Sequence, residues 1–207
     1  MRGARIVGTG RELPPRVVKN EELTKLMDTT DEWIVQRTGI RERRYADPGV
    51  GTSHLGAAAA RKAIDKAGIT VNDIGLIVFA TLSPDYFFPG CAVLVQEQLG
   101  MRTVGALDVR DQCTGFVYGL SVAESYVKGG FHDYVLVIGS EIHSRGMIFT
   151  TAGRDTAVIF GDGAGAAVVG PAEEGRGILS SHLHSEGKFA GELCLEEPGF
   201  LKDPWIT

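Results

Sequence analysis

Apolar runs of strand length alternate with helical segments along this chain, and that order constrains its fold more than any other feature. Residues 74–81 (IGLIVFAT) are a continuous apolar run, as expected of a strand covered on both faces, and residues 133–141 (DYVLVIGSE) are expected to form another buried strand. Residues 53–68 (SHLGAAAARKAIDKAG) carry an apolar stripe of helical period and end on a glycine. This βαβα order predicts an α/β fold, a mostly parallel sheet with helices on both faces.

The remaining elements follow from the same patterns. Thr29 or Thr30 is expected to cap a helix that carries Asp31 and Glu32 in its first turn. The glycines of residues 161–165 (GDGAG) lack the Lys-Ser/Thr ending of a phosphate loop and are expected to form a turn between strands. Further strands are expected at residues 4–10, 105–111, 156–162, 163–170 and 177–183, and further helices at 20–27, 29–39, 91–100 and 114–130.

Composition excludes several functional classes. The chain has 207 residues, 43% of them hydrophobic, and a formal net charge of −5, which argues against general nucleic-acid binding, although residues 37–44 (RTGIRERR) could form a local basic patch. No run approaches the roughly 20 apolar residues that cross a bilayer, and the first residues lack a signal-peptide core. Cys91, Cys113 and Cys194 have no metal-site spacing. We expect a reduced, cytoplasmic protein with no membrane contact.

Cys113 lies where a strand is expected to stop and a helix to begin, in the stretch GALDVRDQCTGFVYGL. First-turn N–H groups of a helix have no partner inside the helix, and the helix dipole favours a thiolate at that position. Gly115, two residues later, would allow backbone or ligand to approach the thiol. The stretch alone is equally compatible with a buried cysteine that acts as a small apolar residue.

Four segments, in order, closely resemble the β-ketoacyl-acyl-carrier-protein synthase III family. They are residues 28–43 (DTTDEWIVQRTGIRER), 113–130 (CTGFVYGLSVAESYVKGG), 160–169 (FGDGAGAAVV) and 178–187 (ILSSHLHSEG). The likeness extends from Arg5 to about Leu195. It implies the thiolase fold, in which two similar halves build an αβαβα core. Residues 1–170 would form the N-terminal half with its nucleophilic cysteine, and residues 171–207 would begin the connection to a second half outside this chain.

The resemblance implies an acyltransferase and condensing enzyme. Cys113 would take the acyl group of acyl-CoA as a thioester, an exchange that is close to isoenergetic for a thiolate. Condensation with a malonyl group on acyl carrier protein would follow, with release of carbon dioxide. Acyl-CoA would be a substrate, so no cofactor and no metal are expected. The implied partners are acyl-CoA, acyl carrier protein, the second half and a second copy in a dimer formed through the N-terminal half.

The same resemblance implies roles for five further residues. Trp33 matches a tryptophan that stacks on the CoA adenine, and Arg154 matches an arginine on the other face of that base. Arg37 matches a contact to a CoA phosphate, and Thr29 a polar contact at the adenine end. Phe88 matches a residue that reaches across the dimer to close the partner's acyl pocket, with packing in the core as the alternative.

Two departures from the family pattern affect these expectations. Asp111 and Gln112 stand where family members often carry small residues, so the size of the acyl pocket is open, and we expect Asp111 to face an interface or a backbone partner. In the family, a histidine and an asparagine of the second half bind the malonyl thioester, and a backbone N–H there helps form the oxyanion hole. None of the chain's histidines lies in that motif: His54, His132, His143, His182 and His184.

Alternative functions remain open on this sequence. Asp111, Gln112 and the aromatic run at residues 86–88 could mark an enzyme that joins two acyl groups head to head, or one that loads a starter unit in polyketide or quinolone-type biosynthesis. A non-catalytic scaffold subunit of a synthase complex is the alternative from a different class.

Overall fold

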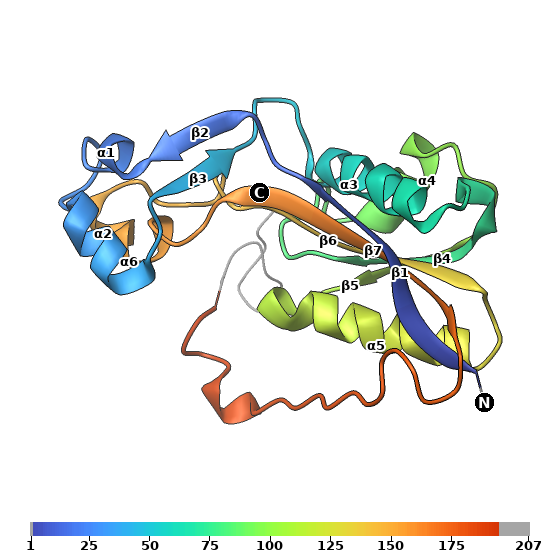
Figure 1. Ribbon diagram of the computed structural model, residues 1–207. Helices are drawn as coiled ribbons and strands as arrows, with labels where there is room; N and C mark the ends of the chain where they lie inside the picture. The colour runs from blue at the N-terminus through green and yellow to red at the C-terminus, as the bar shows by residue number, and fades with distance from the viewer. Residues whose placement is uncertain (1, 195–207) are drawn as a thin grey trace.

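The computed structural model describes residues 2–194, and its largest element is a five-stranded mixed sheet in the order β1-β7-β6-β4-β5 (Figure 1). Strand β4 pairs in parallel with β5 and β6, whereas β7 runs antiparallel to both β6 and β1. Four strands therefore point the same way, which confirms the mostly parallel sheet. The strands are β1 (Gly3–Glu12), β4 (Ile74–Ala80), β5 (Gly105–Val109), β6 (Tyr134–Ile142) and β7 (Asp162–Ala172).

Helices cover both faces of the sheet, as the sequence predicts (Figure 1). Helices α3 (Thr52–Ala67) and α4 (Cys91–Gln98) lie on one face, and α5 (Gly115–Lys128) lies on the other. Phe79 of β4 belongs to the core under α3 and α4, whereas its neighbour Val78 belongs to the core under α5. Each large apolar side chain removed from water stabilises the fold by about 1.5–3 kcal/mol, so both faces contribute.

Glycines allow the helices to approach the sheet closely. A Cβ on Gly10 of β1 would lie 2.1 Å from the carbonyl oxygen of Ala59 in α3. A Cβ on Gly119 of α5 would lie 2.9 Å from the Val137 side chain. These contacts leave no room for a side chain, so the layer spacing depends on the glycines.

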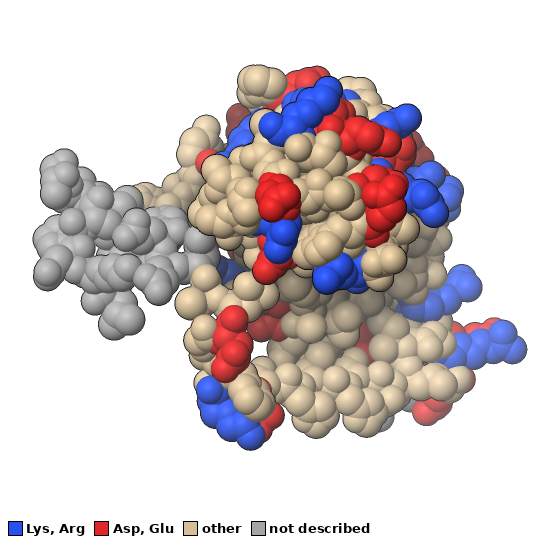
Figure 2. Space-filling view, turned by 90° about the vertical axis from the view of Figure 1, so that its left-hand side faces the viewer, with Lys and Arg blue, Asp and Glu red and all other residues tan. Residues whose placement is uncertain are grey.

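A small lobe extends beyond the sheet, at the left of Figure 1, and packs around its own apolar cluster. Strands β2 (Arg16–Lys19) and β3 (Glu42–Tyr45) pair antiparallel there, next to α1 (Asn20–Leu23), α2 (Asp31–Thr38) and α6 (Arg154–Ala157). Acidic and basic side chains alternate on the face of the molecule seen in Figure 2, which looks toward this lobe. Arg43 of the expected basic stretch is buried, which reduces any basic patch there.

Several expected elements are wrong in detail. The strand expected over 156–162 does not form before Asp162, because Ala157 and Val158 belong to α6 and its end and pack in the lobe core. The glycines of residues 161–165 form no turn between strands, since β7 already begins at Asp162. No strand forms at 177–183, where the Ile178 N–H donates one 2.8 Å bond to the Ala4 carbonyl. The helix expected over 20–27 ends after Leu23.

Short 3-10 turns complete the described chain: η1 (Val71–Asp73), η2 (Gln112–Thr114), η3 (Thr151–Gly153) and η4 (Gly187–Phe189). After β7 the chain passes along α5, where the Ser181 hydroxyl donates a 2.8 Å bond to Glu124. A domain boundary at residue 170 stays a prediction, and the last part of the expected connection lies outside the described residues. Between residues 2 and 194, no helix has both the length and the apolar character needed to cross a membrane.

Candidate functional site

Cys113 lies on the turn between the parallel strand β5 and helix α5. Strand β5 ends at Val109, Cys113 is the middle residue of η2, and α5 begins two residues later at Gly115. The side chain is exposed, so the expected strand-to-helix placement is confirmed and burial in the core is excluded. The thiol is accessible at the carboxyl end of β5, the sheet edge where α/β proteins commonly bind ligands.

The residues before Cys113 hold the turn in a strained conformation. Gln112 has a φ of 42°, a left-handed value that costs a non-glycine residue about 1–2 kcal/mol. The Thr114 hydroxyl donates to the Asp111 carboxylate at 2.8 Å, so this carboxylate has a side-chain partner in its own turn. Strain of this kind concentrates at functional turns, and nothing in the sequence signals it.

Gly115 serves packing rather than ligand approach. A Cβ at this position would lie 3.0 Å from the Cβ of Ala80 in β4. The glycine therefore lets the first turn of α5 lie directly against the sheet, which fixes the height of the Cys113 turn above β4.

Trp33, Arg37 and Arg154 come together in the lobe. Trp33 and Arg37 are one turn apart on α2, and the Arg37 guanidinium carbon lies 4.3 Å from the indole centroid. Arg154, at the start of α6, lies 4.4 Å from the same ring and donates a 2.9 Å bond to the Asp28 carbonyl. The structure thus places a cationic pair on one aromatic ring, although 121 positions separate Trp33 from Arg154 in the sequence.

Two threonines precede α2 and have different roles. Thr30 is the helix cap, since its hydroxyl accepts a 3.1 Å bond from the Trp33 N–H. The hydroxyl oxygen of Thr29 is buried and has no hydrogen-bond partner among the described residues. Buried hydroxyls are nearly always paired, so Thr29 is free to bind a polar group that reaches the end of the lobe.

Phe88 lies in the loop between β4 and α4 and is 82% exposed, so it does not pack in the core. Tyr86 is exposed too. Glu141 anchors the start of this loop by accepting bonds from the N–H groups of Leu82 at 2.8 Å and Ser83 at 3.1 Å. The loop therefore presents an exposed aromatic side chain from a fixed base, and the sequence gives no sign of the anchor.

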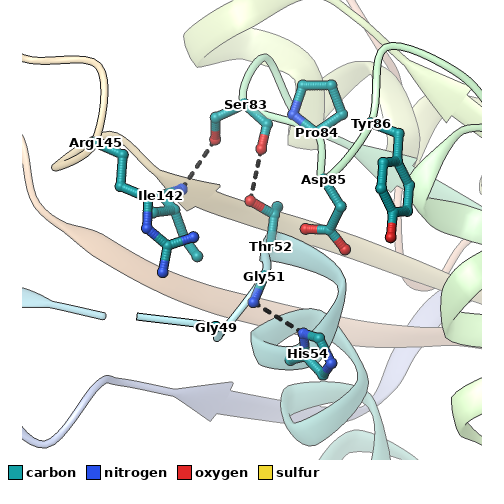
Figure 3. Close-up of a pocket in the computed structure, with 10 residues that line it drawn as sticks. All are labelled: Gly49, Gly51, Thr52, His54, Ser83, Pro84, Asp85, Tyr86, Ile142 and Arg145. Carbon is teal, nitrogen blue, oxygen red and sulfur yellow. Dashed lines mark hydrogen bonds between the residues drawn. The ribbon is translucent and has the colours of Figure 1, made fainter. Parts of the chain in front are cut away.

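A cavity of about 390 Å³ opens at the base of the same loop (Figure 3). Its lining comes from the start of α3, from the loop after β4 and from the segment after β6, and includes His54, Asp85 and Arg145. The His54 ring accepts a 2.8 Å bond from the Gly51 N–H, and the Asp85 carboxylate accepts from the Ser53 N–H at 3.2 Å. None of the predicted site residues lines this cavity, and the sequence analysis did not identify it.

Cys91 contrasts with Cys113. It is fully buried at the start of α4, and burial raises the pKa of its thiol to about 12. Its N–H donates a 2.6 Å bond to Asp108, so the segment is held by the backbone while the sulfur stays protonated. Among residues 2–194, no group of three or more His, Cys, Asp or Glu side chains is arranged to hold a metal ion.

Comparison with known proteins agrees with this arrangement. A family model described as 3-oxoacyl-[acyl-carrier-protein (ACP)] synthase III matches residues 107–187, the part that contains Cys113. A β-ketoacyl-[acyl-carrier-protein] synthase III of Rhizorhabdus wittichii is 52% identical over 190 residues, 91% of this chain and 59% of that protein. The chain therefore spans about three fifths of the length of the curated relatives it matches.

Solved structures give the same result. The chain superimposes on synthase III from Thermus thermophilus with a TM-score of 0.85 and 39% identity, covering 92% of this chain and 58% of that one. The priming β-ketosynthase of the R1128 polyketide pathway gives a TM-score of 0.79 and 38% identity, covering 83% and 51%. Fold and cysteine turn together define a thiolase-like α/β unit. Within that class, the chain belongs to the β-ketoacyl-[acyl-carrier-protein] synthase III family.

Proposed function

We propose that this chain carries the acyl-accepting site of a β-ketoacyl-[acyl-carrier-protein] synthase III. The observation that carries the proposal is the exposed Cys113 thiol in a strained turn at the start of α5. A reactive cysteine needs access and a setting that favours negative charge, and a helix N-terminus supplies the second.

The proposed reaction is a thioester exchange. The Cys113 thiolate attacks the carbonyl carbon of acyl-CoA, and a tetrahedral intermediate forms with negative charge on the former carbonyl oxygen. Collapse of the intermediate breaks the carbon–sulfur bond to CoA, which leaves as a thiolate and takes up the proton that Cys113 lost. The positive end of the α5 dipole would favour both the attacking thiolate and the developing oxyanion.

Trp33, Arg37 and Arg154 are proposed to hold the nucleotide end of CoA. Stacking of a base between Trp33 and Arg154 needs about 7 Å between the two planes, at roughly 3.5 Å per layer. With the guanidinium 4.4 Å from the ring, Arg154 has to move outward and release the Asp28 carbonyl. Arg37 would pair with a phosphate, and the unpartnered Thr29 hydroxyl would bind a polar group of the nucleotide.

The whole protein is proposed to complete a decarboxylative condensation with a malonyl thioester on acyl carrier protein. Strand β5 lies at an edge of the sheet, and an open edge favours pairing with a second copy. Phe88, exposed in the loop whose end bonds to Asp108 of β5 through the Cys91 N–H, is proposed to reach into the partner's acyl pocket. The histidine and asparagine of the condensation step would come from the second half of the protein.

The test is release of free CoA thiol from acyl-CoA substrates of increasing chain length, followed in the native protein and in Cys113→Ala. We expect a stoichiometric burst of CoA in the native protein and none in Cys113→Ala. Cys194→Ala serves as the control, because Cys194 is also an exposed thiol. A burst of equal size in Cys113→Ala would end the proposal, and absence of any burst in both proteins would favour the scaffold role.

Loading of a starter unit in polyketide biosynthesis is a second candidate. It is supported by the likeness to the R1128 priming β-ketosynthase and by the bulky pair before Cys113, Asp111 and Gln112. The two candidates differ in acyl preference, so the same series of acyl-CoA lengths separates them. A preference for acetyl-CoA would favour fatty acid initiation, and a preference for longer or branched acyl groups would favour starter loading.

A further inference from the structure

Arg43 is a buried cation that forms no direct ion pair with a carboxylate of residues 2–194. It lies in β3 and is 6% exposed, and Glu22 acts on it only through a longer-range attraction. Its Nη1 donates to the Val18 carbonyl at 3.3 Å and its Nη2 to the Val158 carbonyl at 3.1 Å, while Nε has no partner among residues 2–194. Burial lowers the pKa of this guanidinium. An apolar side chain of similar length would fill such a site at a lower cost in free energy. The role of Arg43 therefore depends on which segments its two hydrogen bonds join.

The two carbonyls belong to two different arms of the lobe, one made of α2, β2 and β3 and the other of α6. Val18 lies on β2, the partner strand of β3, and Val158 is the residue that ends α6. The backbones come close at this point, since a Cβ on Gly161 would lie 2.9 Å from the Cβ of Arg43. Arg43 therefore fastens the end of α6 to the β2–β3 pair.

The same two arms carry the groups that meet over the Trp33 ring. Helix α2, which holds Trp33 and Arg37, leads directly into β3, and α6 begins with Arg154. Ile34, Ala157 and Val158 belong to one apolar cluster that also joins the arms, but apolar packing is non-directional and allows sliding. The paired bonds of Arg43 have a fixed direction, so they define where α6 lies relative to α2.

We propose that Arg43 is a positioning residue that sets the spacing between Trp33 and Arg154 and so determines affinity for the nucleotide end of acyl-CoA. This inference rests on the proposed acyl-CoA function. Arg43 itself would touch neither the nucleotide nor the acyl group. Its loss would leave the Cys113 turn unchanged, because that turn is built from β5 and α5 on the other part of the molecule.

Arg43→Met and Arg43→Lys, made in the full chain, test the proposal. The rate of Cys113 acylation is measured against acyl-CoA concentration, and binding of adenosine 3′,5′-bisphosphate is followed by Trp33 fluorescence in a Trp205→Phe background. For Arg43→Met we expect KM and the Kd of the bisphosphate to rise about tenfold, with the maximal acylation rate within about twofold. Arg43→Lys should recover part of the lost affinity, because an ammonium group still donates hydrogen bonds although it lacks the planar fork of the guanidinium.

Arg44→Met is the matched control. Arg44 is the next residue on β3 and also donates to main-chain carbonyls, those of Pro14 at 3.3 Å and Pro15 at 3.5 Å, but it does not reach α6. It should leave KM unchanged. Equal KM values for Arg43→Met and the native protein, or a lower maximal rate at unchanged KM, would overturn the proposal.

Circular dichroism and thermal melting check that the variants fold. If Arg43→Met does not fold, Arg43→Lys tests the proposal in the same way: KM should rise while the maximal acylation rate stays unchanged. Failure of the proposed function would look different, since the unmodified protein would then neither release CoA nor bind the bisphosphate, and both proposals would fall together.

Discussion

The guanidinium of Arg154 lies 4.4 Å from the Trp33 ring and is held there by its bond to the Asp28 carbonyl. In the proposed complex with CoA, the adenine would replace this contact with two new stacking contacts, one on each face of the base. We expect Arg154→Ala to weaken binding of adenosine 3′,5′-bisphosphate by about 5- to 30-fold, the loss of about 1–2 kcal/mol of cation–π stacking. Titration of Trp33 fluorescence in a Trp205→Phe protein measures the change.

Arg61→Ala is the control for that titration, because Arg61 on α3 donates to the Gln98 carbonyl away from the lobe. It should bind the bisphosphate as the native protein does. Native-like affinity in Arg154→Ala would contradict the stacking role.

Burial of Cys91 predicts a loss of stability at high pH. The thiol of the unfolded chain ionises near the ordinary value of 9.0, whereas burial holds the folded pKa at about 12. Above about pH 9 the unfolded state binds fewer protons than the folded state, so the free energy of unfolding falls by up to about 1.4 kcal/mol per pH unit. Urea unfolding between pH 9 and 10 measures this slope, to which the raised pKa of Tyr45 adds a similar effect as the pH approaches 10.0, the ordinary tyrosine value.

Cys91→Ala should flatten the slope over the same pH range while lowering stability by a constant amount for the lost sulfur. The exposed Cys194 gives the control Cys194→Ala, in which the slope should persist. A slope that survives in Cys91→Ala would assign the pH dependence to another group.

Gly10 and Gly165 form a matched pair on neighbouring strands. Gly10→Ala places a Cβ 2.1 Å from the Ala59 carbonyl of α3, and only a backbone shift relieves the clash. We expect a loss of about 2 kcal/mol or more in the free energy of unfolding. Nothing lies within 4 Å of a Cβ on Gly165, so Gly165→Ala should stay within about 0.5–1 kcal/mol of the native protein. Urea titrations measure the free energy of unfolding of both variants. Equal losses in the two would contradict the close α3–β1 contact.

Anchoring of the aromatic loop by Glu141 predicts an effect on hydrogen exchange. Glu141→Ala removes the acceptor of the Leu82 N–H and one of two acceptors of the Ser83 N–H, which also donates to the Thr81 hydroxyl. Exchange of Leu82 should accelerate, and stability should fall by about 1–3 kcal/mol. Glu97→Ala, at an exposed position of α4, is the control and should change neither quantity. Unaltered exchange of Leu82 in Glu141→Ala would show that the loop holds its shape without the carboxylate.

The sequence predicts the sheet well and the lobe poorly, for physical reasons. Strand β4 is an unbroken apolar run, β6 begins with one, and α3 combines an apolar stripe with a glycine stop. Strands β2 and β3 are four residues each, without clear alternation, and no strand was expected there. The expected strand at 156–162 is wrong because a short apolar run does not distinguish a strand from a buried helix.

The candidate site, too, is predictable from the sequence only in part. Placement of Cys113 follows from local order, because a strand must end before a helix begins. The contact between Trp33 and Arg154 depends on folding of segments far apart in sequence, and only the family resemblance suggested that both serve one ligand. The strain at Gln112 and the bridge made by Arg43 depend on backbone angles and tertiary contacts that no sequence pattern encodes.

The most direct test of the central claim is to find where an acyl group attaches. The protein is incubated with acyl-CoA, digested with trypsin and analysed by mass spectrometry, since cleavage after Arg110 and Lys128 releases a peptide whose single cysteine is Cys113. We expect the mass of one acyl group on this peptide and its loss on treatment with hydroxylamine. An unmodified 111–128 peptide, with acyl groups on Cys194 or on no cysteine, would contradict the central claim.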